Sequence, residues 1–155
     1  MTAPSFSDVH DTDAEQAEVH LSPSVHLDRR PTARFAFHRH TVARGALDVE
    51  EDRCTDGVRI EVIGQSTYAL GLPVRGTVHA DHRGDELDLG PGRAAVFDPG
   101  SEAAVTTGEG FDVVLVRIRS AALEDALEAL LGRSVRRPLR PRDRKSTRLN
   151  SSHRL

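Results

Sequence analysis

Apolar and polar residues alternate with a period of two over most of the chain between residues 34 and 119. In RFAFHRHTV the rings of Phe35 and Phe37 alternate with His38 and His40. Further short segments of this kind are ALDVEEDRC, VRIEV, STYALGLPV, TVHADH, DELDL, RAAVFD, EAAVTT and FDVVLVRIR. Short runs separated by turn residues are typical of an antiparallel sandwich or barrel, because parallel strands need long crossover connections between them.

Two Pro-Gly corners lie in DLGPGRAAVFDPG, residues 88–100, and they enclose the apolar run from Ala94 to Phe97. Proline fixes φ where a turn begins, and glycine adopts the positive φ that a type II turn needs. The side chain of Asp98 can hydrogen-bond the backbone two residues further on. We therefore expect tight corners between neighbouring strands, with Asp98 in a structural role and not as a general base.

A helix is predicted after the last strand, in SAALEDALEALLGRS. Ser120 is a favourable N-cap residue, and Gly132 lies where a left-handed residue commonly ends a helix. Leucines spaced for one apolar stripe lie between these two residues, and they are Leu123, Leu127, Leu130 and Leu131. We expect the stripe to pack on the barrel wall or on a partner subunit.

The N-terminal residues lack the period of two. Residues 1–11 are polar and are predicted to be disordered. Thr12 and Glu15 have the spacing of a capping box, which predicts a short helix with Ala14, Ala17 and Leu21 on its inner side. The prolines of SPSVHLDRRPT end this helix.

Composition limits the compartment and the class of protein. The chain has 155 residues and one cysteine, Cys54, so no internal disulfide forms, which fits either a reducing cytoplasm or indifference to the redox environment. No run of 18 apolar residues is present, and the N-terminus lacks the basic-then-apolar order of a secretion signal. We therefore predict a cytoplasmic, single-domain protein without membrane contact.

Charge divides the chain unevenly. Residues 1–132 carry 12 Arg and 23 acidic side chains, whereas residues 133–155 carry nine basic side chains and one acid, which gives the chain a basic tail. Such tails can contact nucleic acid. However, lysine and asparagine occur only in the final RKSTRLNSSHRL, which also has no apolar period. We interpret residues 142–155 as a disordered, non-native tail, with a natural disordered tail as the alternative. Under either interpretation its arginines are weak evidence for DNA binding.

The order of motifs between Tyr68 and Val135 is more specific than any single motif. A strand ending in LPVRG precedes a short hairpin and LGPG. VFDPG follows, then an apolar strand with a terminal Arg pair, and then a Leu-striped helix ending in LLGR. This series resembles the ligand-binding domain of AraC/XylS-type bacterial transcription regulators. With its weaker N-terminal part, the resemblance assigns residues 12–141 to that domain.

The resemblance implies a mainly β fold, an antiparallel cupin-like jelly-roll barrel with a short N-terminal helix and a C-terminal amphipathic helix. In such regulators this domain senses a small-molecule effector or mediates homodimerisation, and two helix-turn-helix motifs in another domain bind DNA. After RRPLRPRD no second helix follows with the turn that a helix-turn-helix needs. We therefore expect a truncated regulator, a sensor that reaches DNA only through a domain absent from this chain.

The histidines leave a second function open. His38 and His40 project from one face of a strand, a geometry that suits a metal ion, so a small metal-dependent cupin enzyme is the alternative. Metal-binding cupins resemble this pattern but add a glutamate shortly afterwards, whereas no acid precedes Asp48 here. Acidic neighbours are expected to raise the pKa of Cys54, and neither a nucleophile elbow nor a phosphate loop is present. We predict no catalytic residue, no metal and no cofactor, and hence no enzyme.

A small barrel can hold one ligand at its mouth. Tyr68 and His79 have polar tips, and we predict that they contact the effector. The competing interpretations are that Tyr68 belongs to the core, that His79 lies on the surface, and that side chains fill the barrel completely. Leu123, Leu127 and Leu130 of the C-terminal helix are the predicted dimer contacts. A fragment that does not fold well alone is the remaining alternative.

Overall fold

The structure is a computed structural model, and it describes residues 3–12, 17, 25–27 and 35–135. Strands account for most of the described residues, and a single regular helix follows them. In chain order the elements are β1 (Ser5–Asp11), β2 (Val25–Leu27), β3 (Phe37–Arg44), β4 (Leu47–Cys54), β5 (Arg59–Val62), β6 (Thr67–Arg75), β7 (Val78–His82), β8 (Asp85–Leu89), β9 (Ala95–Phe97), β10 (Ala103–Thr107), β11 (Phe111–Arg119) and α2 (Ser120–Leu131).

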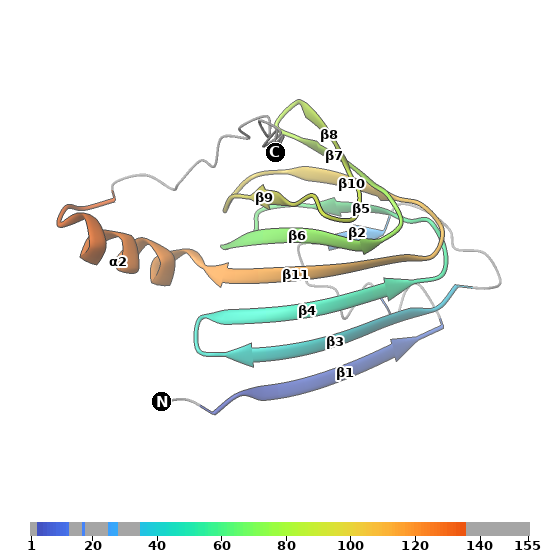
Figure 1. Cartoon of the computed structure of the whole chain (residues 1–155), viewed down its shortest axis with the longest axis horizontal. Coiled ribbons are helices and arrows are strands. Elements are labelled where there is room, and N and C mark those ends of the chain that lie inside the picture. The colour runs from blue at the N-terminus through green and yellow to red at the C-terminus, as the bar shows by residue number, and fades with distance from the viewer. Residues whose placement is uncertain (1–2, 13–16, 18–24, 28–34, 136–155) are drawn as a thin grey trace, which may run out of the picture.

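The strands form two antiparallel sheets that face each other (Figure 1). The six-stranded sheet has the order β1-β3-β4-β11-β6-β9, and the five-stranded sheet has the order β2-β5-β10-β7-β8. Every segment predicted from the period of two forms a strand, so the mainly β, antiparallel prediction is confirmed. The predicted barrel is not closed, because each sheet ends in strands that pair on one side only among the described residues.

The core lies between the inner faces of the two sheets. Phe37, Cys54 and Phe111 of the six-stranded sheet pack in one cluster that also includes Val58 and Ile60 from the other side. A second cluster joins the two sheets through the buried residues Val78, Leu89 and Ala95. Alternate residues of each strand therefore point inward, and the apolar period seen in the sequence marks this face.

The Pro-Gly corners connect the two sheets. Gly92 has φ of 83° and Gly100 has φ of 73°, so both glycines adopt the positive φ that was predicted. The corners do not join neighbouring strands, however. β8 and β10 belong to the five-stranded sheet while β9, between them in the chain, belongs to the other. Each corner therefore carries the chain across the core, as the connections of jelly rolls do.

The N-terminal prediction is wrong for residues 5–11, which form strand β1 and do not lack structure. β1 pairs with β3 from Ser5 opposite Ala43 to Asp11 opposite Phe37. An edge strand with one solvated face can be polar, because its pairing depends on backbone hydrogen bonds and not on burial. The helix predicted after Thr12 falls mostly outside the described residues, although Ala17 itself is buried.

The C-terminal helix α2 follows β11 without an intervening loop. Its N-cap residue is Arg119 and not Ser120, because the strand continues through Arg119, whose ψ of 130° is extended. Gly132 ends the helix in the left-handed conformation and donates its N–H to the carbonyl of Glu128, as predicted. No residue of α2 is buried, and the helix projects away from the sheets (Figure 1). Among the described residues no helix is long and apolar enough to cross a membrane.

Candidate ligand-binding cavity

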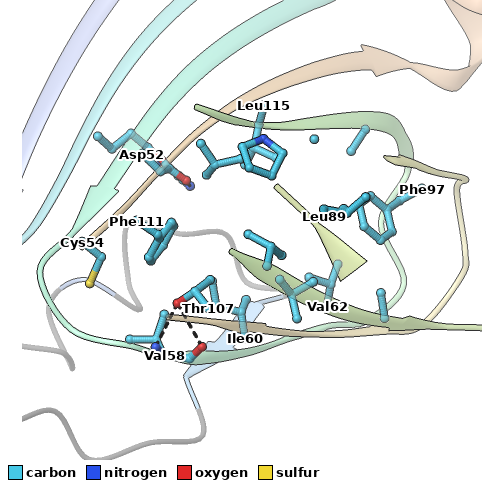
Figure 2. A pocket seen from close by; sticks show the side chains of 18 of the residues that line it. Asp52, Cys54, Val58, Ile60, Val62, Leu89, Phe97, Thr107, Phe111 and Leu115 are labelled. Atoms are coloured by element: carbon cyan, nitrogen blue, oxygen red, sulfur yellow. Dashed lines mark hydrogen bonds and ion pairs between the residues drawn. The ribbon is translucent and has the colours of Figure 1, made fainter. Parts of the chain in front are cut away.

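A cavity of about 110 Å³ lies between the two sheets. Its walls come from both sheets and are mostly apolar, and Figure 2 shows the side chains of Leu115, Leu89, Val62 and Ile60 around it. The interior is therefore not completely filled by the protein's own side chains. Mostly apolar, concave sites of this kind are the usual places where proteins hold small molecules.

Small residues on strand β6 and on β10 of the facing sheet keep this space open. Ala69 and Gly71 of β6 line the cavity, as does Ala103 of β10. A Cβ on Gly71 would lie 3.6 Å from the side chain of Leu115 and 3.7 Å from the ring of Phe97. A larger residue at position 71 would therefore occupy the space between these two side chains.

Charged side chains lie on the inner face of the six-stranded sheet. Arg39 of β3 donates to both carboxylate oxygens of Asp52 on β4, with Nε to Oδ1 at 2.7 Å and Nη2 to Oδ2 at 2.6 Å. Burial lowers the pKa of Arg39, but the hydrogen bond and the charges of Asp52 and Glu50 raise it above its ordinary value overall. The fork of Arg39 is therefore fully charged and held by Asp52.

Arg117 of β11 extends this charged group toward α2. Its Nε donates to Oε2 of Glu50 at 3.0 Å, and Nη2 of Arg39 lies 3.5 Å from the same oxygen. Arg117 lines the cavity, as do Arg39 and Asp52, and its side chain is 13% exposed. We call Arg39, Glu50, Asp52 and Arg117 the charged quartet. Burying ions at this depth is costly unless they are paired, which the quartet achieves with two charges of each sign.

At the opposite end of the cavity, the polar side chains are either hydrogen-bonded to the backbone or uncharged. Thr107 accepts a hydrogen bond from the Val58 N–H at 3.0 Å and donates to the Val58 carbonyl at 3.3 Å (dashed lines, Figure 2). Burial is the main reason that the pKa of the Cys54 thiol rises from 9.0 to about 11. The predicted direction is correct, although desolvation and not acidic neighbours is the largest cause, and Cys54 stays an inert thiol at neutral pH.

Tyr68, one of the predicted ligand contacts, does not line the cavity. It alternates with Ala69 on β6 and therefore lies on the other face of the sheet, where it is 3% exposed. Its hydroxyl lies 3.3 Å from Oε1 of Glu124 on α2. The buried tyrosine thus connects the outer face of the sheet to the first turns of the helix.

His79, the other predicted contact, also points away from the cavity. Its ring is about half exposed, and Nδ1 lies 2.9 Å from Oδ1 of Asp88 on the neighbouring strand. That hydrogen bond is the main reason that the pKa of His79 is raised above its ordinary value. The structure does not bring Tyr68 and His79 together. Arg117 was not predicted, although one signal existed: it occupies an inward position of FDVVLVRIR, in phase with Val113 and Leu115.

The two histidines of the alternative metal site lie on the outer face of the six-stranded sheet. Phe37 and Arg39, which alternate with them, line the cavity. His38 contacts Asp8 of β1, with Nε2 to Oδ1 at 2.6 Å. Within the described part of the chain, no three His, Cys, Asp or Glu side chains are grouped to hold a metal ion. His38 and His40 therefore face away from the cavity.

Asp98 stabilises the corner after β9. Its carboxylate is buried, accepts a hydrogen bond from Arg83 and lies 3.3 Å from Nε2 of His82. Its backbone carbonyl accepts from the Ser101 hydroxyl at 2.6 Å. Burial is the largest cause of the lowered pKa of His82, which favours the neutral ring. These contacts join the β7–β8 turn to the β9–β10 connection, as expected for a structural aspartate.

Comparisons with known proteins agree with this architecture. A family model described as the AraC-binding-like domain matches residues 12–151. The crystal structure of the AraC-like transcriptional activator CuxR is similar, with a TM-score of 0.69 at 16% sequence identity. The match covers 83% of this chain and 52% of that chain, so this chain spans about half of the activator's length.

A second solved structure extends the likeness of fold. The cupin domain of Cnp3 from Schizosaccharomyces pombe matches with a TM-score of 0.50 at 8% identity, over 72% of this chain and 78% of that chain. At such low identity the match shows a shared fold alone. No curated protein matches the sequence.

Proposed function

The chain belongs to the AraC-binding-like domain family, and from that premise we propose that it is the effector-sensing domain of a cytoplasmic transcription regulator. The effector binds in the cavity between the two sheets and is not chemically changed there. One observation carries the proposal: the core keeps a cavity of about 110 Å³ whose wall is apolar except for a few polar side chains. A domain that only held other domains together would gain stability by filling that space.

DNA contact belongs to another domain in this proposal. The similar activator is about twice as long as the part that matches here, which leaves room for a DNA-binding domain in proteins of that design. The described part of this chain offers one helix, which is exposed and alone. Effector binding by this chain would therefore be read out through a partner domain.

We also propose that α2 mediates dimerisation with a second copy of the chain. Leu130 is 82% exposed and Leu131 is 54% exposed. Leu123 and Leu127 lie on the same stripe and are half-buried. Exposed leucines in a regular stripe are the usual mark of a helix that packs against another helix.

A cavity-filling variant tests effector binding. Gly71→Leu places a side chain between Leu115 and Phe97, so we expect it to abolish binding of small apolar molecules. Wild-type protein should gain about 2.7 kcal/mol of stability at a ligand concentration of 100 times Kd. The measurement is the thermal unfolding midpoint across a panel of single-ring compounds.

Val96→Leu is the matched control, because Val96 lies on the neighbouring strand but is exposed on the outer face and does not line the cavity. It should bind as the wild type does. If no compound raises the midpoint of the wild type, or if Gly71→Leu responds equally, the proposed cavity is not an effector site.

A further inference from the structure

Two polar side chains that line the cavity keep hydrogen-bonding capacity that the protein does not use. Arg117 uses Nε to bind Glu50, but within the described part of the chain its two Nη nitrogens have no partner. Gln65 lines the cavity as well, and its backbone carbonyl accepts from Gly100 N–H at 2.7 Å. Its side-chain amide has no hydrogen bond to any residue that the structure describes. Such groups are available to a ligand.

The remaining polar groups on the wall are occupied. Arg39 and Asp52 satisfy each other in a two-point contact, and Thr107 exchanges hydrogen bonds with the Val58 backbone. Direct hydrogen bonds to a ligand are therefore concentrated on Arg117 and Gln65, and the rest of the wall offers apolar contact.

Both available groups lie at the same end of the cavity. Arg117 pairs with Ala69 of β6, and Arg119 pairs with Thr67, two residues after Gln65. Phe111 begins β11 at the other end, where it packs with Phe37 and Val58. A ligand in this space meets hydrogen-bond donors at one end and aromatic and aliphatic side chains at the other.

The charge balance decides what kind of acceptor fits. The charged quartet contains two guanidinium groups and two carboxylates, so its net charge is zero before any ligand binds. A ligand carboxylate beside Arg117 would add an uncompensated negative charge close to Glu50, which already accepts from the same guanidinium. A neutral carbonyl accepts the Nη hydrogen bond without changing the charge of the buried site.

Size limits the ligand further. An engineered protein cavity of about 150 Å³ holds one benzene molecule, and the cavity here is about 110 Å³. We infer that the effector is an uncharged, single-ring or similarly small aliphatic molecule with a carbonyl oxygen at one end, such as a cyclic ketone, lactone or lactam, and that Arg117 donates to that oxygen. This inference rests on the proposed function of the cavity as an effector site.

Three probes with the same number of non-hydrogen atoms separate the alternatives. Cyclohexanone carries the carbonyl, methylenecyclohexane replaces it by an apolar group, and cyclobutanecarboxylate carries a charge. Dissociation constants for the full-length chain, measured by calorimetry or NMR titration, should be lowest for cyclohexanone and highest for the carboxylate. Tighter binding of the carboxylate to the wild type overturns the inference without any variant.

Two variants of the charged quartet test the role of Arg117. The double variant Glu50→Gln/Arg117→Met removes the Arg117 donor together with its buried counterion, the Glu50 carboxylate. It should lower the preference for cyclohexanone over methylenecyclohexane by about tenfold, the usual worth of a hydrogen bond to a charged group. Glu50→Gln alone leaves the site one positive charge in excess, and it should strengthen carboxylate binding by about tenfold.

The outcomes distinguish this inference from the function on which it rests. If methylenecyclohexane binds but the ketone preference survives removal of Arg117, the cavity is an effector site and Arg117 does not select the ligand. If Glu50→Gln leaves carboxylate binding unchanged, the charge argument fails. If none of the three probes binds the folded wild type, both the inference and the proposed effector site are wrong.

Discussion

At the scale of residues, the two arginines on the inner face of the six-stranded sheet differ in how they are paired. Arg39 is held at two points by Asp52, so it keeps the charged quartet neutral and fixed. Among the described residues Arg117 makes one hydrogen bond, from Nε to Glu50, and its Nη donors are not used. Because Arg117 is held at one point and not at two, it can also donate hydrogen bonds to a ligand.

Cys54 gives a pH dependence of known sign. Its folded-state pKa is raised to about 11 from an ordinary value of 9.0, mainly by burial. The neutral thiol therefore stabilises the fold fully below about pH 9, and this stability is lost as the pH rises toward 11, because only the unfolded chain ionises readily in that window. We expect urea unfolding to show a steeper loss of stability between these pH values in the wild type than in Cys54→Ala.

Thiolate absorbance near 240 nm checks the same titration directly in the folded protein. An ionisation at or below pH 9 in native conditions would contradict the burial argument. Alkylation by iodoacetamide at pH 8 should be slow in the folded protein and fast in urea.

At the scale of elements, local sequence patterns predicted those strands and helix ends whose positions depend on nearby residues. The nine strands from β3 to β11 follow from alternation and turn residues, and the end of α2 follows from Gly132. β1 was missed because its polar sequence depends on pairing with β3, whose partner residues lie 26 to 38 positions further along the chain. Tyr68 was predicted as a ligand contact but does not line the cavity, and alternation could not show this, because it tells which residues share a face but not which face is inward.

The exposed leucines of α2 give a prediction about assembly. Leu130→Glu should convert dimers to monomers, because it places a charge on the exposed leucine stripe of the proposed helix contact. Since Leu130 is 82% exposed in one copy, the stability of the monomer should change by less than about 0.5 kcal/mol. Sedimentation velocity measures the first effect, and chemical unfolding the second.

Ala121→Glu is the control, since it adds the same charge at a residue that is exposed on the opposite side of the helix. It should leave the dimer intact. A wild-type chain that is monomeric at all concentrations, or a Leu130→Glu variant that still dimerises, would exclude α2 as the interface.

At the scale of the whole molecule, the stability of each strand follows from its place in the sheets. β11 pairs with β4 and β6 along its length, and β10 pairs with β5 and β7. β1 and β9 have one partner each among the described strands. Long-range pairing dominates, so the fold of the core depends on segments that are distant in the chain.

Hydrogen exchange should therefore rank the strands. Backbone amides of β10 and β11 should exchange most slowly, with a free energy close to that of global unfolding, and those of β1 and β9 should exchange faster through local opening. Mass spectrometry of proteolytic fragments measures this order. Uniformly fast exchange would show instead that the chain does not hold its fold alone, which was the remaining alternative from the sequence.

The edge strand β8 has a consequence for solubility. Sheets whose last strand has one open edge can add strands from another molecule and grow into aggregates, and charge on that edge opposes such growth. Asp85, Glu86 and Asp88 are exposed along this five-residue strand. We therefore expect two copies that approach edge to edge through β8 to repel each other, and dissolved salt to weaken that repulsion and favour precipitation.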